Sequence, residues 1–284
     1  MKKIISLVLA GVMCMGLTSC KKVSDKTDLA YIQEKGKITI GVTNYPPMNY
    51  LDDEGNWTGF DTEFAEAVAK KLGVDVEFVE ISWEAKATEL ASKNIDCLWN
   101  GMCITDERKE MWEVTKPYMY NTQAMVMKAD KEADILKDVA GKKIVAEAGS
   151  TGEGKILGDI DDTQDATVEV MAKDYFAKAN YTGVASMATA LMEVQSGMAD
   201  VAVVDSVIAQ GMVGGADSQF KDLVVNTDNK FGAQYFGIAF RKGDVELCQK
   251  VNDAIDELIE SGELDTIAEK YGLQDGIAAA AEVR

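Results

Sequence analysis

The chain contains no histidine, few prolines and far fewer basic than acidic residues. The absence of histidine excludes histidine general bases, Ser-His-Asp triads and histidine metal ligands. With 29 basic against 48 acidic residues, the formal net charge is −19. Nucleic-acid binding depends on clustered lysine and arginine, and the sequence contains no such cluster. We therefore expect no nucleic-acid partner, and we interpret the acidity as a contribution to solubility.

After the first 20 residues, no apolar run approaches the ~20 residues that cross a bilayer, so we expect a water-soluble body. The start of the chain is different. Lys2 and Lys3 precede an apolar stretch over 4–16, and small residues follow up to Cys20. This order is typical of a secretory signal. A buried helix is the alternative, but no polar residues follow at helical spacing. We predict a signal peptide over residues 1–19.

The tetrapeptide Leu17-Thr18-Ser19-Cys20 resembles the lipobox of bacterial lipoproteins. The resemblance implies cleavage before Cys20 and diacylation of that residue. Two acyl chains hold a protein on a membrane stably where one does not. Residues 20–28 would then comprise the lipidated cysteine and a polar tether. We therefore expect a lipid anchor on the extracytoplasmic face of the cell membrane.

The chain has five cysteines, of which Cys14 lies in the signal and Cys20 in the lipobox. The remaining three, Cys97, Cys103 and Cys248, are an odd number without a CxxC pair. This pattern argues against a disulfide framework and against a metal site. We predict three free thiols and no bound metal.

The spacing of apolar residues predicts strands that alternate with helices. Strands are expected over 37–42, 75–79, 95–99, 142–147, 200–204 and 236–240. Helices are expected over 60–72, 84–93, from 105 to about 112, and over 187–196, 247–261 and 264–271. Asp61 is a candidate N-cap and Gly73 a candidate stop for the first of them. The similar openings at 37–42 and 142–147 predict an α/β protein of two lobes. Each lobe would hold a mostly parallel sheet and present strand ends to a shared cleft.

The segment 99–109 is the richest in chemistry. A strand ends, Gly101 allows close approach of a ligand to the backbone, and Thr105 can cap a new helix with Arg108 in its first turn. A helix N-terminus and a guanidinium together can bind a carboxylate. The alternative, that Arg108 merely pairs with Asp106 or another surface acid, stays open from spacing alone.

Several motifs occur in order along the chain. They are Gly41…Tyr45-Pro46-Pro47-Met48-Asn49-Tyr50, Gly55…Gly59-Phe60-Asp61, Asn94-Ile95-Asp96, Gly101…Ile104-Thr105-Asp106-Glu107-Arg108-Lys109 and Tyr235-Phe236-Gly237-Ile238-Ala239-Phe240-Arg241-Lys242-Gly243. The ordered set resembles the polar amino-acid-binding family of ABC-importer solute-binding proteins, from about residue 35 to 273.

The resemblance implies a two-lobe, periplasmic-binding-protein-like (type II) fold with a two-strand hinge. Lobe 1 would be discontinuous, over 29–118 plus 236–284, and lobe 2 would cover 123–231. The hinges would fall at about 118–122 and 232–235. The implied partners are a free L-amino acid and the membrane permease subunits with a separate ATPase, since this chain has no Gly-x-x-x-x-Gly-Lys-Ser/Thr loop. We expect a monomer without a cofactor.

The resemblance also implies roles for single residues. Arg108 would bind the ligand α-carboxylate with help from Thr151 of lobe 2, and Asp205 would pair with the α-ammonium. Gly101 and Cys103 would face these two groups. A zwitterion needs a cation and an anion facing it, because burying either charge unpaired is costly. Asp205 could instead simply cap the helix that follows it.

Three further residues complete the predicted ligand-binding site. Tyr45 and Trp83 correspond to the aromatic walls around the ligand side chain, and Asn100 adjoins Gly101. Trp83 could instead be ordinary core. The family usually has Ser or Thr where this chain has Cys103, and often an acid where it has Thr43 and Asn44. These departures leave the specificity for the ligand side chain open.

Glu147 is the main clue to specificity, because it ends a strand at a position that faces the ligand side chain in relatives. A carboxylate there could pair with a cationic side chain such as lysine, arginine or ornithine, or accept a hydrogen bond from an amide. The alternative is a solvated glutamate at the end of a strand.

Two other functions compete with a transport receptor. A few relatives on this fold are dehydratases of cyclic acids (cyclohexadienyl-dehydratase-like), and Glu147 is the one candidate general acid. A ligand sensor that acts through a separate membrane partner is the other. We predict the receptor and not an enzyme, because Arg108, Thr151 and Asp205 form a complete set for a zwitterion.

Overall fold

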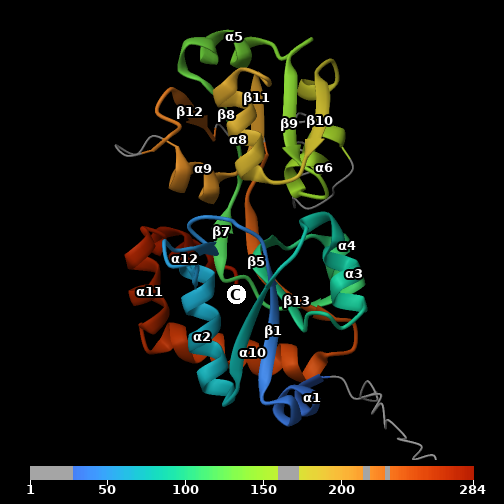
Figure 1. The fold of residues 1–284 in the computed structure, drawn as a ribbon, viewed down its shortest axis with the longest axis vertical. Coiled ribbons are helices and arrows are strands. Elements are labelled where there is room, and N and C mark those ends of the chain that lie inside the picture. Colours follow the sequence, from blue (N-terminus) through green and yellow to red (C-terminus); the bar gives the residue numbers. More distant parts are fainter. Residues whose placement is uncertain (1–27, 159–172, 214–217, 228–230) are drawn as a thin grey trace, which may run out of the picture.

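A computed structural model describes residues 28–158, 173–213, 218–227 and 231–284 (Figure 1). The predicted signal peptide, Cys20 and all but the last residue of the predicted tether lie outside these residues. The described chain forms two α/β lobes, one above the other in Figure 1, each built around one sheet. Two chain segments connect the lobes, one leading from β7 to β8 and the other from β12 to β13.

The lower lobe has the strand order β4-β1-β5-β13-β6, with β7 also paired to β13. Its strands are β1 (Lys37–Val42), β4 (Asp75–Glu80), β5 (Cys97–Cys103), β6 (Trp112–Val114), β7 (Met119–Asn121) and β13 (Gln234–Arg241). A separate short pair, β2 (Tyr50–Leu51) with β3 (Trp57–Thr58), lies on the loop before α2. Its helices are α1 (Asp28–Lys35), α2 (Phe60–Leu72), α3 (Lys86–Ala91), α4 (Asp106–Met111), α10 (Val245–Glu260), α11 (Glu263–Tyr271) and α12 (Gln274–Ala281).

The upper lobe has the strand order β10-β9-β11-β8-β12. Its strands are β8 (Gln123–Lys128), β9 (Lys143–Glu147), β10 (Asn180–Val184), β11 (Val201–Asp205) and β12 (Leu223–Asn226). Its helices are α5 (Glu132–Lys137), α6 (Thr151–Leu157), α8 (Met187–Ser196) and α9 (Ser206–Met212). Single turns of 3-10 helix precede α3 and α5, at Trp83–Ala85 and Ala129–Lys131.

The upper sheet is apolar on both faces, as a sheet covered by helices on both sides must be. Successive residues of a strand point to opposite faces. Ala202 and Val204 of β11 accordingly pack in one cluster with the apolar residues of α8, whereas Val201 and Val203 pack in another with Ile156 of α6. All five residues of β11, where a strand was expected over 200–204, are buried for this reason.

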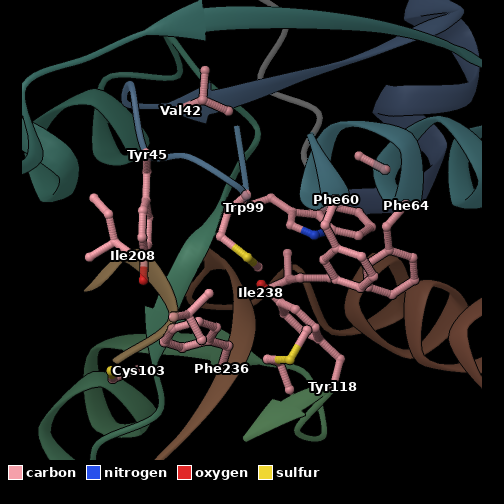
Figure 2. Packing of buried hydrophobic residues seen from close by; sticks show 14 of the residues in the cluster. Val42, Tyr45, Phe60, Phe64, Trp99, Cys103, Tyr118, Ile208, Phe236 and Ile238 are labelled. Atoms are coloured by element: carbon pink, nitrogen blue, oxygen red, sulfur yellow. The ribbon is translucent and has the colours of Figure 1, made fainter. Parts of the chain in front are cut away.

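The lower lobe has an aromatic core that includes Phe60, Phe64, Trp99 and Tyr118 (Figure 2). The ring of Phe64 on α2 contacts Trp99 of β5 edge-on at 5.0 Å between centroids, and Tyr118 at 5.3 Å. Phe60 packs on Phe64 at 5.7 Å. This cluster joins the helix that follows the first loop to the strand that carries Gly101 and Cys103.

The expected α/β architecture is confirmed, but the sheets are mixed where the sequence predicted mostly parallel ones. β1 pairs in parallel with β4 and β5, and β9 with β10 and β11. β13 and β8, which carry the chain between the lobes, pair antiparallel with their neighbours. Alternation of strands and helices reveals the parallel units only, because an antiparallel partner needs no helix in between.

One predicted helix cap is wrong. Gly59, not Asp61, occupies the N-cap position of α2, and Asp61 lies inside the first turn, fully buried. Its carboxylate is used for a tertiary contact to β5 instead. The stop at Gly73 is confirmed by its left-handed conformation, and α8 has the predicted bounds and ends at Gly197 in the same way.

Candidate ligand-binding site

The nine residues predicted to bind ligand line one cavity between the lobes, which encloses about 390 Å³ between atoms, part of it open to solvent. They are Tyr45, Trp83, Asn100, Gly101, Cys103, Arg108, Glu147, Thr151 and Asp205. The sequence prediction did not include the other lining residues, Ser150, Ser186, Met187 and Ile208, nor did it count Thr43 and Asn44 as site residues.

Arg108 lies in the first turn of α4, whose N-cap Thr105 accepts a hydrogen bond from the Arg108 backbone N–H at 3.1 Å. The guanidinium is buried, lies 5.8 Å from the centre of the Trp83 ring and donates to the Cys103 carbonyl at 2.7 Å. Among the described residues it forms no ion pair within 4.0 Å, and Asp106 pairs with Lys109. A buried cation without an anion is suited to bind a carboxylate.

Asp205 ends β11 on the opposite lobe and is 2% exposed. It occupies the N-cap position of α9, but its side chain accepts no hydrogen bond from that helix. Its carboxylate accepts from the Tyr45 hydroxyl at 3.0 Å, from Asn121 at 2.8 Å and from Gln123. Burial raises the pKa of Asp205, and these hydrogen bonds oppose the rise. The capping alternative is therefore wrong, and the carboxylate faces the cavity.

Two amides that hold Asp205 were not predicted from the sequence. Asn121 and Gln123 belong to the segment that crosses from the lower lobe to the upper one, and Gln123 also donates to Gln234 of the returning strand at 2.9 Å. The signal available in the sequence is that Asn121 lies in the predicted hinge 118–122 and that Gln123 follows it directly.

Gly101 has φ +56°, and a Cβ there would lie 2.5 Å from Cε1 of Tyr45. Only glycine combines this left-handed backbone with the close approach of the aromatic wall. The Gly101 N–H donates to Asp61 at 2.8 Å, and the Tyr118 hydroxyl donates to the same oxygen at 2.9 Å. Burial raises the pKa of Asp61 to about 7. This carboxylate holds the β5 backbone in place from below.

Asn100 and Cys103 are both buried in β5 and make different contacts. The Asn100 side-chain amide donates to the Thr43 carbonyl at 3.2 Å, and the Thr43 hydroxyl donates to the Asn100 side-chain oxygen at 2.6 Å. These two bonds hold the loop that carries Tyr45. The Cys103 thiol is buried 3.8 Å from Asp205 and 3.6 Å from Gln234. Within the described residues it forms no disulfide, and neither do Cys97 and Cys248.

The two aromatic walls come from the lower lobe. Tyr45 lies beside Ile208 of α9 (Figure 2). Trp83 is only 6% exposed and packs with Leu90 and Ile95, so it belongs to the core and to the cavity at once.

Thr151 is the first residue of α6, which Ser150 caps by accepting from the Glu153 N–H at 3.2 Å.

Glu147 is 6% exposed, so the solvated alternative is wrong. Its carboxylate lines the cavity and has no hydrogen bond or ion pair with any residue that the structure describes. Burial, and secondarily the charge of Asp205, raise the pKa of Glu147 to about 8, whereas Lys86 opposes the rise. Such a group is stabilised by a cation or hydrogen-bond donor supplied from outside the chain.

Residues 38–274 match the family model of bacterial extracellular solute-binding proteins, family 3. The chain belongs to this family. A relative, the L-cystine-binding protein TcyJ of Escherichia coli K12, is 32% identical over 93% of this chain and 94% of the relative. The family is extracellular, which puts the chain outside the cytoplasm. Among the described residues no helix is long and apolar enough to span a membrane.

Two solved structures agree with this fold. A Streptococcus pneumoniae ABC uptake transporter substrate-binding protein with bound histidine superimposes with a TM-score of 0.72 at 30% identity, covering 85% of this chain and 94% of that one. An ancestral amino-acid-binding protein, AncCDT-1, is described as a precursor of cyclohexadienyl dehydratase. It superimposes with a TM-score of 0.72 at 31% identity, covering 86% of this chain and 98% of that one.

Proposed function

We propose that this protein is the extracytoplasmic receptor of an ABC importer and that it binds one free polar L-amino acid between its lobes. The observation that carries the proposal is the pair Arg108 and Asp205. One is a buried cation on the lower lobe that has no ion pair with any described residue, and the other is a buried carboxylate on the upper lobe. Both line the same cavity. The named ligands of similar proteins, cystine and histidine, are also free amino acids.

The charges define how a ligand would lie. Its α-carboxylate would accept from Arg108, Thr151 and the cavity-facing backbone near Gly101. Its α-ammonium would donate to Asp205, which Asn121 and Gln123 hold in position. Because Arg108 and Asp205 belong to different lobes, the ligand carboxylate and ammonium are both paired only when the lobes are together. Binding therefore favours closure.

The remaining parts of the proposal concern the cell. Residues 1–19 would be removed and Cys20 lipidated, so that the receptor is tethered to the membrane and delivers its ligand to separate permease and ATPase subunits. Lobe 1 would comprise 29–118 plus 236–284 and lobe 2 would comprise 123–231, with hinges at 118–122 and 232–235. The receptor would act as a monomer without a cofactor.

A dehydratase is the second candidate, because Glu147 is a buried carboxyl group whose raised pKa, about 8, suits a general acid. We favour the receptor, since a zwitterion-binding pair has no use in a site for a cyclic acid without an ammonium group. Turnover of a cyclohexadienyl acid by the purified protein would reverse this preference.

The test is thermal unfolding of the purified protein with single L-amino acids. A ligand that binds only the folded state raises the unfolding midpoint by mass action. Arg108→Gln and Asp205→Asn should each weaken binding at least ~30-fold, because losing one partner of a buried charge pair costs about 2–5 kcal/mol. The exposed neighbour Lys109→Gln is the matched control. No shift with any amino acid, even after unfolding and refolding to remove co-purified ligand, would contradict the proposal.

A further inference from the structure

A buried carboxyl group that does not line the cavity lies behind the strand end at Gly101. Asp61 is the second residue of α2 and is fully buried. Within the described part of the chain its Oδ1 atom has no hydrogen bond, and no charged side chain shifts its pKa. Burying a carboxyl group away from a cation costs stability relative to an apolar residue. The contacts of its other oxygen indicate what Asp61 does at this position.

The Oδ2 atom of Asp61 connects the ligand cavity to the segments that cross between the lobes. It accepts from the Gly101 N–H at 2.8 Å and from the Tyr118 hydroxyl at 2.9 Å. Gly101 lines the cavity. Tyr118 precedes β7, and its N–H donates to the carbonyl of Phe236 in β13 at 3.0 Å. One carboxylate oxygen therefore fixes the strand end at the base of both crossing segments.

The hydrogen bond to Gly101 sets the orientation of backbone that lines the cavity. The peptide unit between Asn100 and Gly101 is planar, so its N–H and its carbonyl turn together. Both residues line the cavity. An ionised carboxylate accepts a hydrogen bond roughly twice as strong as a neutral group does. The backbone at Gly101 is therefore held more tightly when Asp61 is ionised.

The ionisation of Asp61 is finely balanced. Burial raises its pKa to about 7, whereas the Gly101 N–H, the Tyr118 hydroxyl and the Trp99 indole lower it. Its place in the first turn of α2 also favours the anion. Of these groups only Tyr118 titrates, and burial raises the pKa of Tyr118 well above its usual value.

The other titratable groups near this region are directed elsewhere. Glu63, the next acid along α2, binds Lys270 and Tyr271 of α11. Glu147 and Asp205, the carboxyl groups of the cavity, belong to the upper lobe. A change in the proton content of Asp61 therefore acts on the cavity through the backbone of Gly101.

We propose that Asp61 is a positioning residue for ligand binding: its ionised carboxylate holds Gly101 in the binding conformation, and its protonation loosens this hold and weakens binding. The inference rests on the proposed function, because it concerns the affinity of that same cavity. The chain belongs to an extracellular family and so meets the pH of its surroundings. Acid surroundings would lower its affinity.

The direction of the effect follows from linkage. A bound ligand fixes the backbone at Gly101, which strengthens the bond to Asp61 and lowers the pKa of that carboxyl group. By reciprocity, the contribution of Asp61 to affinity is present above pH 7 and is lost as the pH falls below about 7. We expect the loss to be about fivefold, the difference between a hydrogen bond to a charged group and one to a neutral group.

The experiment is isothermal titration of wild type and Asp61→Asn from pH 5.5 to pH 8. The probes are L-arginine and L-glutamine, whose charges are constant in this range. If neither binds, the probe is the L-amino acid that raises the unfolding midpoint most. Both proteins contain Glu147 and Asp205, so the ratio of their affinities isolates Asp61. Wild type should bind about five times more tightly than Asp61→Asn at pH 8 and nearly equally at pH 5.5.

Two further variants support the assignment. Tyr118→Phe removes one donor to the carboxylate, so the fall in affinity should begin about one pH unit higher than in wild type. Asp75→Asn, at an exposed position of β4, is the matched control and should follow wild type at every pH. Unfolding midpoints of the ligand-free variants verify that they remain folded.

Ligand-free wild type offers a direct readout that does not depend on any variant. The amide proton of Gly101 should move upfield in NMR spectra as the pH falls through about 7, because its hydrogen bond to Asp61 weakens. An amide signal without this inflection would overturn the proposal.

The binding data separate the two levels of the account. If Asp61→Asn weakened binding by the same factor at every pH, Asp61 would be a structural residue only, and the positioning role would be refuted while the proposed function stands. If no L-amino acid bound at any pH, the proposed function would fail and this inference with it.

Discussion

At the scale of single residues, the site is a set of buried charges whose partners are missing from the described chain. Arg108 and Asp205 were predicted because a family motif marks them. The contact of Lys86 between the lobes was not predicted, because it depends on the Trp83 ring and on a carbonyl 63 residues away in sequence, at Gly149. Local spacing carries no information about such a contact. Glu147 was predicted as a strand end, but its burial became visible only in the fold.

Glu147 gives a pH prediction. Its ordinary pKa is near 4.5 and burial raises it to about 8, so between these pH values the folded state holds the proton more tightly than the unfolded chain does. The contribution of protonated Glu147 to the stability of the folded state is therefore fully present below pH ~4.5. This contribution is lost as the pH rises through about 8. A tenfold difference in proton affinity corresponds to ~1.4 kcal/mol.

The measurement is the unfolding midpoint of ligand-free protein from pH 5 to pH 8. Glu147→Gln should lose less stability over this range than the wild type, and the exposed Glu260→Gln should match the wild type. Equal slopes for wild type and Glu147→Gln would show that the carboxyl group is not held protonated by burial.

At the scale of elements, two short segments position the ligand groups: the capped turn of α4 and the strand end at Gly101. Most of the helices and strands could be predicted from apolar spacing and glycine stops. The pairing direction of β8 and β13 could not, because antiparallel partners far apart in sequence leave no local pattern. The role of Asp61 was mistaken for the same reason, since its contact to Gly101 spans 40 residues.

The cap of α4 supports a stability prediction. Thr105→Ala removes the acceptor of the Arg108 N–H and should cost ~1 kcal/mol of unfolding free energy, the usual value of an N-cap. Because Arg108 lies in that turn, ligand affinity should fall as well. Thr105→Ser keeps the hydroxyl and should retain most of the unfolding free energy and most of the ligand affinity. Denaturant unfolding and titration measure the two effects, and an alanine variant with unchanged affinity would separate the cap from the site.

Gly101→Ala tests the strand end. The left-handed backbone alone should cost ~1–2 kcal/mol for an L-residue. The added Cβ would also displace Tyr45 and its hydrogen bond to Asp205, so we expect roughly tenfold weaker ligand binding. Gly73→Ala is the control, since its φ is +71° with no atom within 4 Å of an added Cβ. The control should lose stability but not affinity; equal affinity of both variants would contradict the role of Gly101.

At the scale of the whole molecule, the lobes are held together across the cavity by a small number of contacts. Tyr45 donates to Asp205, Lys86 donates to Gly149, and Pro47 lies against Gly211 of α9. A Cβ on Gly211 would lie 2.7 Å from Cδ of Pro47. Substitution there acts on the contact between the lobes without changing any cavity residue.

Gly211→Ala should therefore weaken binding while leaving the lobes intact. Alanine favours a helix by up to ~1 kcal/mol over glycine, so the ligand-free unfolding midpoint should not fall. Overpacking of the closed contact typically costs about 1–3 kcal/mol, so affinity should drop roughly fivefold or more. Small-angle scattering should give a larger radius of gyration than for Gln210→Ala, the control on the same helix. An unchanged affinity and radius would mean that this contact does not contribute to closure.

The central claim is that one amino acid bridges the lobes through its own two charges. The most direct measurement is the affinity of the wild-type protein for its best-binding L-amino acid, compared with two analogues of it: the α-decarboxylated amine and the α-deaminated acid. We predict that each analogue binds at least ~30-fold more weakly, because each leaves Arg108 or Asp205 buried without its partner. If either analogue bound as tightly as the intact amino acid, the bridge between Arg108 and Asp205 would be contradicted.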